Sequence, residues 1–194
     1  MWMLILGLVL FLGAHSVRIF GEAWRARTID RLGAGAWKGL YSVVSLIGLA
    51  LIVWGFAAAR QHPVVLWSPP AALKHLNSLF TLLAFVLLAA AYVPRNRIRA
   101  RLHHPMILGV KLWAFGHLLA TATLADVLLF AAILLWAVLD FRAARQRDRA
   151  LGTVYAPGAL APTVLVVVIG VAAWAAFAFW LHAAWIGVAP ITRS

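Results

Sequence analysis

Long apolar runs alternate with short arginine-rich stretches along the whole chain. A helix that crosses a bilayer needs roughly 20 mostly apolar residues, and six runs approach that length. We therefore predict an all-α fold, a polytopic membrane helix bundle with about six transmembrane helices, in a single domain over residues 1–194. The predicted helices cover residues 2–20, 37–59, 71–93, 105–120, 124–140 and 163–185, and the segments between them are predicted loops.

The hairpin over residues 105–140 is slightly short for two full spans and a turn. A shallow or partial crossing by one of its helices would be tolerated where that helix packs against protein. The first apolar run lacks a basic leading segment and a good cleavage site, so it is predicted to be the first membrane helix instead of a cleaved signal.

Basic residues concentrate on alternate connections, which supports an even number of spans. The opposite side carries only Arg60, Lys74 and Arg193. Because Lys and Arg accumulate on cytoplasmic connections, we predict a bacterial inner-membrane protein with both termini in the periplasm. The side predicted as cytoplasmic holds eleven arginines: Arg25, Arg27, Arg31, Arg95, Arg97, Arg99, Arg101, Arg142, Arg145, Arg147 and Arg149.

Composition narrows the classes of function. The chain is 65% hydrophobic and carries a net charge of +12, from 17 Lys and Arg against 5 Asp and Glu. In a soluble protein this charge would suggest nucleic acid, but here it lies between apolar runs, so the lipid bilayer is the expected partner. The absence of cysteine excludes disulfides, thiolate metal sites and cysteine nucleophiles.

Two histidines inside predicted spans are the main candidates, because an ionisable residue in a span suggests a function. His15 lies late in the first helix, and Arg18 follows three residues later on the same face. His117 lies in the helix over 105–120, where Trp113 and Gly109 precede it at spacings of four residues. Such a face would suit either a flat cofactor or a packed helix interface. A structural role for each histidine, such as a hydrogen bond to a backbone carbonyl, is an equal alternative.

The other ionisable residues have simpler explanations. Lys111 reaches toward the headgroups or binds a carboxylate, and the first is favoured. His182 is expected at the membrane interface. Asp126 begins the helix over 124–140, too far from His15 and His117 to join them. Four histidines in or beside loops are expected to be solvated or to cap helices, with only a weak metal signal from the adjacent pair: His62, His75, His103 and His104.

The depths of His15 and His117 favour haem b. If Lys111 marks the membrane surface, the two histidines lie roughly 8 Å and 9 Å deep, and haem iron accepts axial histidines. Arg18 and Lys111 would bind the propionates, and Trp113 would contribute an apolar wall. A proton relay is a competing use, whereas two histidines without a carboxylate make a poor zinc or non-haem iron site.

Several motifs together give the chain a specific resemblance. Over essentially its whole length it resembles the NnrU family of bacterial inner-membrane proteins, which is associated with nitrite and nitric oxide metabolism in denitrifying bacteria. The motifs are His15-Ser-x-Arg18, Trp37-Lys-Gly-Leu-Tyr41-Ser, Tyr92-Val-Pro94-x-Asn96-Arg, His104-Pro-x-x-x-Gly109-x-Lys111-x-Trp113-x-x-x-His117 and Leu181-His182-x-x-x-Ile186-Gly187-Val.

The same domain resembles the 15-cis-zeta-carotene isomerase of plants and cyanobacteria. That enzyme is a haem b protein in which reduction of the iron changes axial ligation and permits cis–trans isomerisation. The resemblance implies that His15 and His117 match its two histidine ligands. Its cysteine, three residues before the second ligand and implicated in the ligand switch, is replaced here by Ala114.

Three hypotheses follow. The preferred one is an inner-membrane b-type haem protein that acts in nitrogen-oxide-linked redox chemistry or sensing. The second is an isomerase-like enzyme whose apolar carotenoid substrate enters from the lipid. The third is a cofactor-free transporter or assembly factor, in which the histidines are structural.

Overall fold

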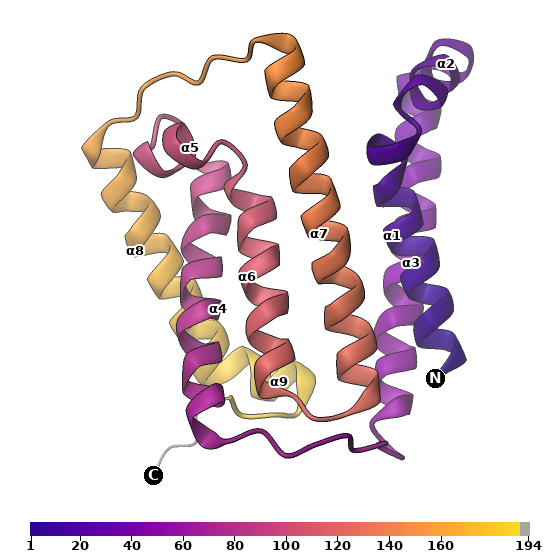
Figure 1. The fold of residues 1–194 in the computed structure, drawn as a ribbon, viewed down its shortest axis with the longest axis vertical. Coiled ribbons are helices and arrows are strands. Elements are labelled where there is room, and N and C mark those ends of the chain that lie inside the picture. Colours follow the sequence, from indigo (N-terminus) through magenta and orange to yellow (C-terminus); the bar gives the residue numbers. More distant parts are fainter. Residues whose placement is uncertain (191–194) are drawn as a thin grey trace. The chain divides into compact units, whose positions relative to one another are not determined.

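The structure, a computed structural model that describes residues 1–190, is almost entirely helical (Figure 1). Arg193 lies outside these described residues. In chain order the elements are α1 (Trp2–Phe20), α2 (Glu22–Leu32), α3 (Ala34–Ala59), α4 (Ala71–Tyr92), α5 (Arg97–Leu102), α6 (Pro105–Ala120), α7 (Leu124–Leu151), α8 (Leu160–Ala176), the π-helical segment η1 (Phe177–Leu181) and α9 (His182–Ile186).

Five helical stretches within the described residues are long and apolar enough to cross a membrane. They are α1, α3, α4, α7 and the continuous stretch Leu160–Ile186, which comprises α8, η1 and α9. The apolar α6 has 16 residues and is therefore about 24 Å long, short of a hydrocarbon core of about 30 Å. These findings confirm the prediction of a polytopic, all-α membrane protein. The short helix α6 lies in the hairpin over residues 105–140, which was predicted to be slightly too short for two full spans.

Three polar segments predicted as loops are helical instead. α2 fills most of the segment 21–36, α5 lies within 94–104, and α7 continues to Leu151 where an end near residue 140 was predicted. Arginine is a good helix former, so a run of arginines does not by itself end a helix. The arginines therefore indicate where a helix leaves the apolar region, but the helix itself continues beyond that point.

The chain forms two compact units, and the division falls within α7. The first unit contains residues 1–68 and 122–143, and the second contains residues 69–121 and 144 onward. α1, α2, α3 and most of α7 therefore belong to the first unit. The second unit holds α4, α5, α6, α8, η1 and α9.

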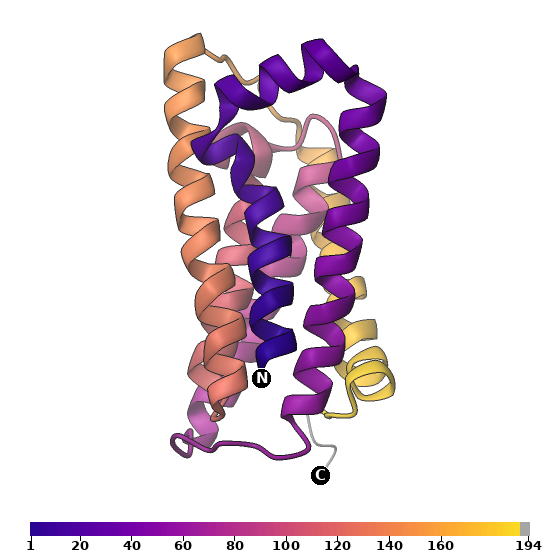
Figure 2. The same cartoon turned by 90° about the vertical axis from the view of Figure 1, so that its right-hand side faces the viewer.

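In the first unit α1 and α3 pack side by side, and α2 joins them at one end (Figures 1 and 2). Glycines allow the two backbones to touch. A Cβ atom added at Gly7 would lie 2.6 Å from the backbone nitrogen of Ile52, and one at Gly55 would lie 2.3 Å from that of Leu4. Gly48 makes a third contact of this kind. Small residues at such positions are typical of helix pairs in membranes.

In the second unit α4 packs against both α6 and α8 (Figure 1). A Cβ atom at Gly109 would lie 3.0 Å from the carbonyl oxygen of Ala84, and one at Gly170 would lie 2.6 Å from Cα of Val86. Gly109 and Gly116 thus allow α6 to pack closely against α4.

Asp126 has a structural role at the start of α7. Its Oδ2 accepts hydrogen bonds from the backbone N–H and the hydroxyl of Thr123, at 3.1 and 2.6 Å. The hydroxyl of Thr123 in turn accepts the N–H of Asp126 at 3.3 Å. This reciprocal arrangement is a capping box, and it satisfies donors that the first turn of α7 would otherwise leave unpaired.

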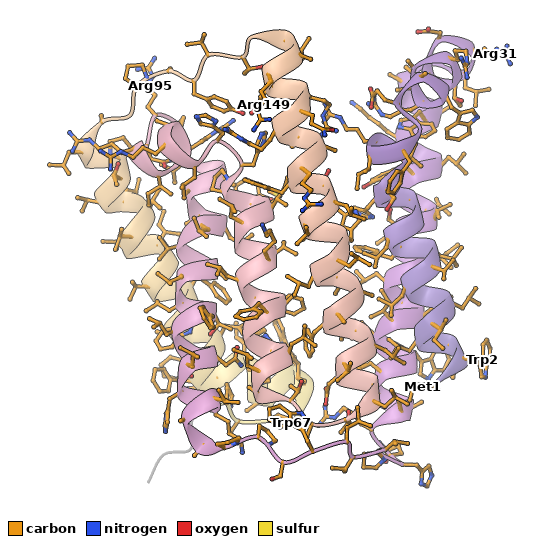
Figure 3. The ribbon with its side chains drawn as sticks, in the orientation of Figure 1. Met1, Trp2, Arg31, Trp67, Arg95 and Arg149 are labelled. Atoms are coloured by element: carbon orange, nitrogen blue, oxygen red, sulfur yellow. The ribbon has the colours of Figure 1, made fainter. Side chains whose placement is uncertain are left out.

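Charged and aromatic side chains lie at opposite ends of the first unit. Arg31 lies at one end, whereas Trp2 and Trp67 lie at the other (Figure 3). In the second unit Arg95 and Arg149 share one end (Figure 3). Large apolar side chains remain exposed between such ends, for example Leu46, which is 64% exposed. This distribution is that of helices in contact with lipid.

We predict that Gly55→Ala destabilises the protein. The new Cβ would overlap the backbone of α1, which cannot rotate away, and overpacking costs about 1–3 kcal/mol. The midpoint of thermal unfolding in detergent should fall. Gly13→Ala is the matched control, because nothing lies within 4 Å of a Cβ atom at Gly13. Equal midpoints for the two variants would contradict direct backbone contact.

Candidate functional site

His15 of α1 is held by its own helix. Its Nδ1 lies 2.7 Å from the carbonyl oxygen of Phe11, one turn earlier. A carbonyl oxygen only accepts hydrogen bonds, so Nδ1 carries the proton in this contact. In the neutral imidazole Nε2 then has the lone pair. This hydrogen bond therefore fixes both the tautomer and the ring orientation of His15.

Aromatic rings from three helices surround His15 in the first unit. The centroid of its ring lies 4.2 Å from that of Phe11, 5.2 Å from that of Tyr41 on α3, and 5.9 Å from that of Trp136 on α7. The indole of Trp136 meets the imidazole edge-on, at 89°, and its buried Nε1 makes no hydrogen bond within the described structure. The imidazole thus lies in a largely apolar, aromatic setting.

Tyr41 and Trp136 were not predicted as neighbours of His15. Tyr41 belongs to one of the sequence motifs, but nothing in the motif indicates which residue its ring contacts. Trp136 gave no signal at all, because an aromatic residue within an apolar helix is most often a packing residue.

His117 of α6 repeats the arrangement of His15. Its Nδ1 donates to the carbonyl oxygen of Trp113 at 2.8 Å, which fixes the same tautomer. The rings of Trp113 and His117 lie 5.0 Å apart at 49°, so the two side chains share the face that their spacing predicted. The hydroxyl of Thr121 donates to the backbone oxygen of His117 at 2.8 Å and secures the end of the helix.

His15 belongs to the first unit and His117 to the second. Their joint ligation of one haem stays a prediction. In the structure each imidazole is half-buried, and its Nδ1 is hydrogen-bonded to the backbone carbonyl one turn earlier. That is the arrangement in which metal-ligating histidines are usually held.

Arg18 and Lys111, the two cations predicted to bind the haem propionates, lie in different surroundings. The side chain of Arg18 is 61% exposed, and its Nε lies 3.9 Å from Oε2 of Glu22, the first residue of α2. Arg18 thus lies at the surface near an acidic group. Lys111 is half-buried on α6. It precedes His117 by about 9 Å along the helix and lies about a third of a turn around it.

A second polar cluster, which the sequence did not predict, lies in the second unit. His104 Nε2 lies 2.8 Å from Oδ2 of Asp148, and the hydroxyl of Tyr155 donates to the same oxygen at 3.0 Å. The ring of His103 stacks on Tyr155 at 4.1 Å and 5°, and its Nδ1 accepts a hydrogen bond from Arg145 Nη1. His103 and His104 do cap helices, since His103 follows the last residue of α5 and His104 precedes the first residue of α6. Their side chains, however, are half-buried partners in a network and are not solvated.

This network connects three distant parts of the chain. His103 and His104 separate α5 from α6, Asp148 lies near the end of α7, and Tyr155 lies in the connection to α8. Burial raises the pKa of the Tyr155 hydroxyl above its ordinary value of 10.0, and the hydrogen bond to Asp148 and its charge raise it further. The cluster thus fixes the connection over 152–159 against the start of α6.

The remaining histidine near a span end is structural. Nδ1 of His182 donates to the carbonyl oxygen of Val188 at 2.6 Å, which ties the first residue of α9 to the segment after that helix. Within residues 1–190, no group of three or more His, Cys, Asp or Glu side chains is placed to hold a metal ion.

Comparison with known proteins identifies one family. The family model described as "NnrU protein" matches residues 3–190, nearly the whole chain. No curated protein and no solved structure matches the chain significantly.

We predict that Asp148→Ala loosens the connection over 152–159. The substitution leaves His104 and Tyr155 without their shared acceptor. We expect the free energy of unfolding to fall by about 1–3 kcal/mol. Limited proteolysis should cut faster near Val154, which is 90% exposed, and thermal unfolding should occur earlier. Asp30→Ala is the control, because Asp30 is an exposed carboxylate on α2. Equal cleavage rates in the two variants would contradict the network.

We predict that the hydroxyl of Tyr155 ionises at a higher pH than that of an ordinary tyrosine. Its raised pKa means that the folded state favours the protonated hydroxyl, so the stabilisation is complete below pH 10.0 and is lost as pH rises through the raised value. The difference in tyrosinate absorbance between the native protein and Tyr155→Phe should show a midpoint above that of a blocked tyrosine in the same detergent. An equal or lower midpoint would refute the contact with Asp148.

Proposed function

Because the chain belongs to the NnrU family, we propose that it is an integral inner-membrane protein that binds haem b through Nε2 of His15 and Nε2 of His117. The observation that carries this proposal is shared by the two histidines. Each donates Nδ1–H to a backbone carbonyl one turn earlier, at 2.7 and 2.8 Å. Each imidazole therefore presents its Nε2 lone pair in a fixed direction.

The residues around the two imidazoles fit a haem. Axial histidine ligands need a neutral ring, and a hydrogen bond to the opposite nitrogen makes them more basic. Apolar rings suit the macrocycle, and Tyr41, Trp136 and Trp113 supply them beside the two histidines. Arg18 and Lys111 are the cations proposed for the two propionates, since guanidinium and ammonium groups bind carboxylates.

When bound, haem would supply a one-electron redox couple. The chain's own residues would orient the ligands and exclude water. The carbonyl oxygens of Phe11 and Trp113 hold the two imidazoles in one tautomer, and aromatic rings limit the access of solvent to His15. We connect this chemistry to nitrite and nitric oxide metabolism through the family resemblance.

The isomerase alternative has weaker support than the haem proposal. Ala114 occupies the position of the isomerase cysteine and is 0% exposed, and a methyl group there can neither ligate iron nor exchange with His117. A cysteine-dependent ligand switch is therefore unavailable to this chain. Isomerisation by another route would still need an apolar substrate from the lipid.

We further propose that both termini face the periplasm and that the arginine-rich connections face the cytoplasm. The distribution of basic residues along the sequence supports this orientation. A bacterial inner membrane is the setting in which this rule would apply to a protein of the family.

Replacement of either ligand should change the haem spectrum. His15→Gly and His117→Gly, each purified in detergent from haem-supplemented cells, are expected to lose the low-spin spectrum of six-coordinate iron because one axial nitrogen is missing. Added imidazole should restore it, since the small molecule can occupy the vacated position. His75→Gly is the matched control, because His75 is an exposed histidine near the start of α4.

Three results would separate the alternatives. A low-spin spectrum that persists unchanged in both glycine variants would refute ligation by His15 and His117. Haem-free native protein would favour a cofactor-free role with structural histidines. Conversion of a cis-carotenoid in a reconstituted host would favour the enzyme hypothesis.

A further inference from the structure

Four arginines lie within seven residues at the junction of α4 and α5. We call Arg95, Arg97, Arg99 and Arg101 the arginine platform. All four are exposed, and no acidic residue lies between positions 94 and 104. Figure 3 shows Arg95 at the end of the second unit. Repulsion between like charges disfavours such a cluster, and an anion bound among the guanidinium groups would offset that repulsion.

The platform is built on a buried asparagine. Asn96 is 1% exposed, and its Nδ2 donates to the carbonyl oxygens of Ala90 and Val93 at 2.9 and 2.6 Å. Its Oδ1 accepts the backbone N–H of Arg99 at 2.7 Å. One side chain thus fixes the end of α4 to the start of α5 and sets the direction in which the arginines project.

The segment before α8 and the first turn of α8 hold the platform from a second side. The backbone N–H of Arg97 donates to the hydroxyl of Thr163 at 2.9 Å, and the N–H of Ala159 donates to the carbonyl oxygen of Arg95 at 2.8 Å. A Cβ atom at Gly158 would lie 2.3 Å from the backbone nitrogen of Arg97, so the backbones of these two segments are in direct contact. A scaffold this closely packed limits the conformational entropy that the backbone would lose when it binds a ligand.

Exposed apolar side chains border the arginines. Tyr92 is 75% exposed at the end of α4, Leu160 is 59% exposed at the start of α8, and Leu102 is 40% exposed at the end of α5. Cations beside exposed apolar and tyrosine side chains are typical of the interface between hydrocarbon and headgroups. Nucleic acid would be bound by cations in a polar setting, so these neighbours favour a lipid.

From this juxtaposition we propose that the arginine platform binds the phosphate headgroup of an anionic phospholipid. Guanidinium groups match phosphate oxygens in a two-pronged geometry. Arg97 and Arg101, four residues apart, lie on one face of α5, while Tyr92 and Leu160 contact the glycerol and upper acyl region. The proposal does not depend on haem binding, because α5 carries neither histidine ligand.

The test compares lipid retention by the full chain and two double variants. Each protein is reconstituted into nanodiscs of phosphatidylcholine mixed with phosphatidylglycerol, and retained lipids are identified by native mass spectrometry. Arg97→Gln with Arg101→Gln should reduce the preference for phosphatidylglycerol roughly 10- to 30-fold, since each basic residue near an anionic surface contributes to binding. Arg27→Gln with Arg31→Gln is the matched control, with the same spacing and the same loss of charge on exposed positions of α2.

Several outcomes would overturn the proposal. An equal loss in the control would assign the preference to net charge alone, and an unchanged preference in the platform variant would remove the site. Competition by inorganic phosphate at low millimolar concentration would assign the site to the free anion, and retained RNA in place of lipid would assign it to nucleic acid. Unfolding midpoints in pure phosphatidylcholine discs show whether each variant is folded.

A further variant tests whether Asn96 is needed to position the arginines. Asn96→Ala keeps all four arginines but removes three hydrogen bonds that orient them. Most of the preference for phosphatidylglycerol should be lost in this variant. Full retention would mean that the arginines act as a diffuse charge, which would contradict a built site.

Discussion

Close contact between helix backbones is the constraint on which the structure depends. Lipid tails are as apolar as the helix surfaces, so the hydrophobic effect does not bring membrane helices together, and van der Waals contact must. Glycine makes that contact possible, as a Cβ atom at Gly55 only 2.3 Å from the nitrogen of Leu4 shows. These contacts fix the register of α1 on α3, and the register in turn places the ring of His15 beside that of Tyr41, at 5.2 Å.

A second constraint is that polar groups away from water need partners inside the protein. His15 and His117 find theirs in their own helices, at backbone carbonyls one turn earlier. This solution satisfies each ring and at the same time fixes the direction of its Nε2 lone pair. Outside the apolar runs, the side chain of Asn96 finds its partners within six residues along the chain. Asp148, in contrast, accepts hydrogen bonds from Tyr155 and from His104, which lies 44 residues away.

The sequence predicted the apolar helices well, because hydrophobic length is the main signal of a span: residues 2–20 and 105–120 match α1 and α6 to the residue. It missed α2 and α5, since their arginines indicated loops while arginine itself favours helix. Spacing predicted that Trp113 and His117 share a face. The contact between His104 and Asp148 spans 44 residues, and no local pattern encodes a pairing across such a distance. The same holds for the ring of Trp136 beside His15.

Haem binding is tested by an absorption spectrum of the native protein, purified in detergent from haem-supplemented cells, in oxidised and dithionite-reduced forms. We expect a Soret band that shifts on reduction and a sharp α-band, as for haem b with two histidine ligands. A featureless visible spectrum, obtained although haem was available during expression, would contradict haem binding. His15 and His117 would then be structural residues whose hydrogen bonds serve only to satisfy their rings within the membrane.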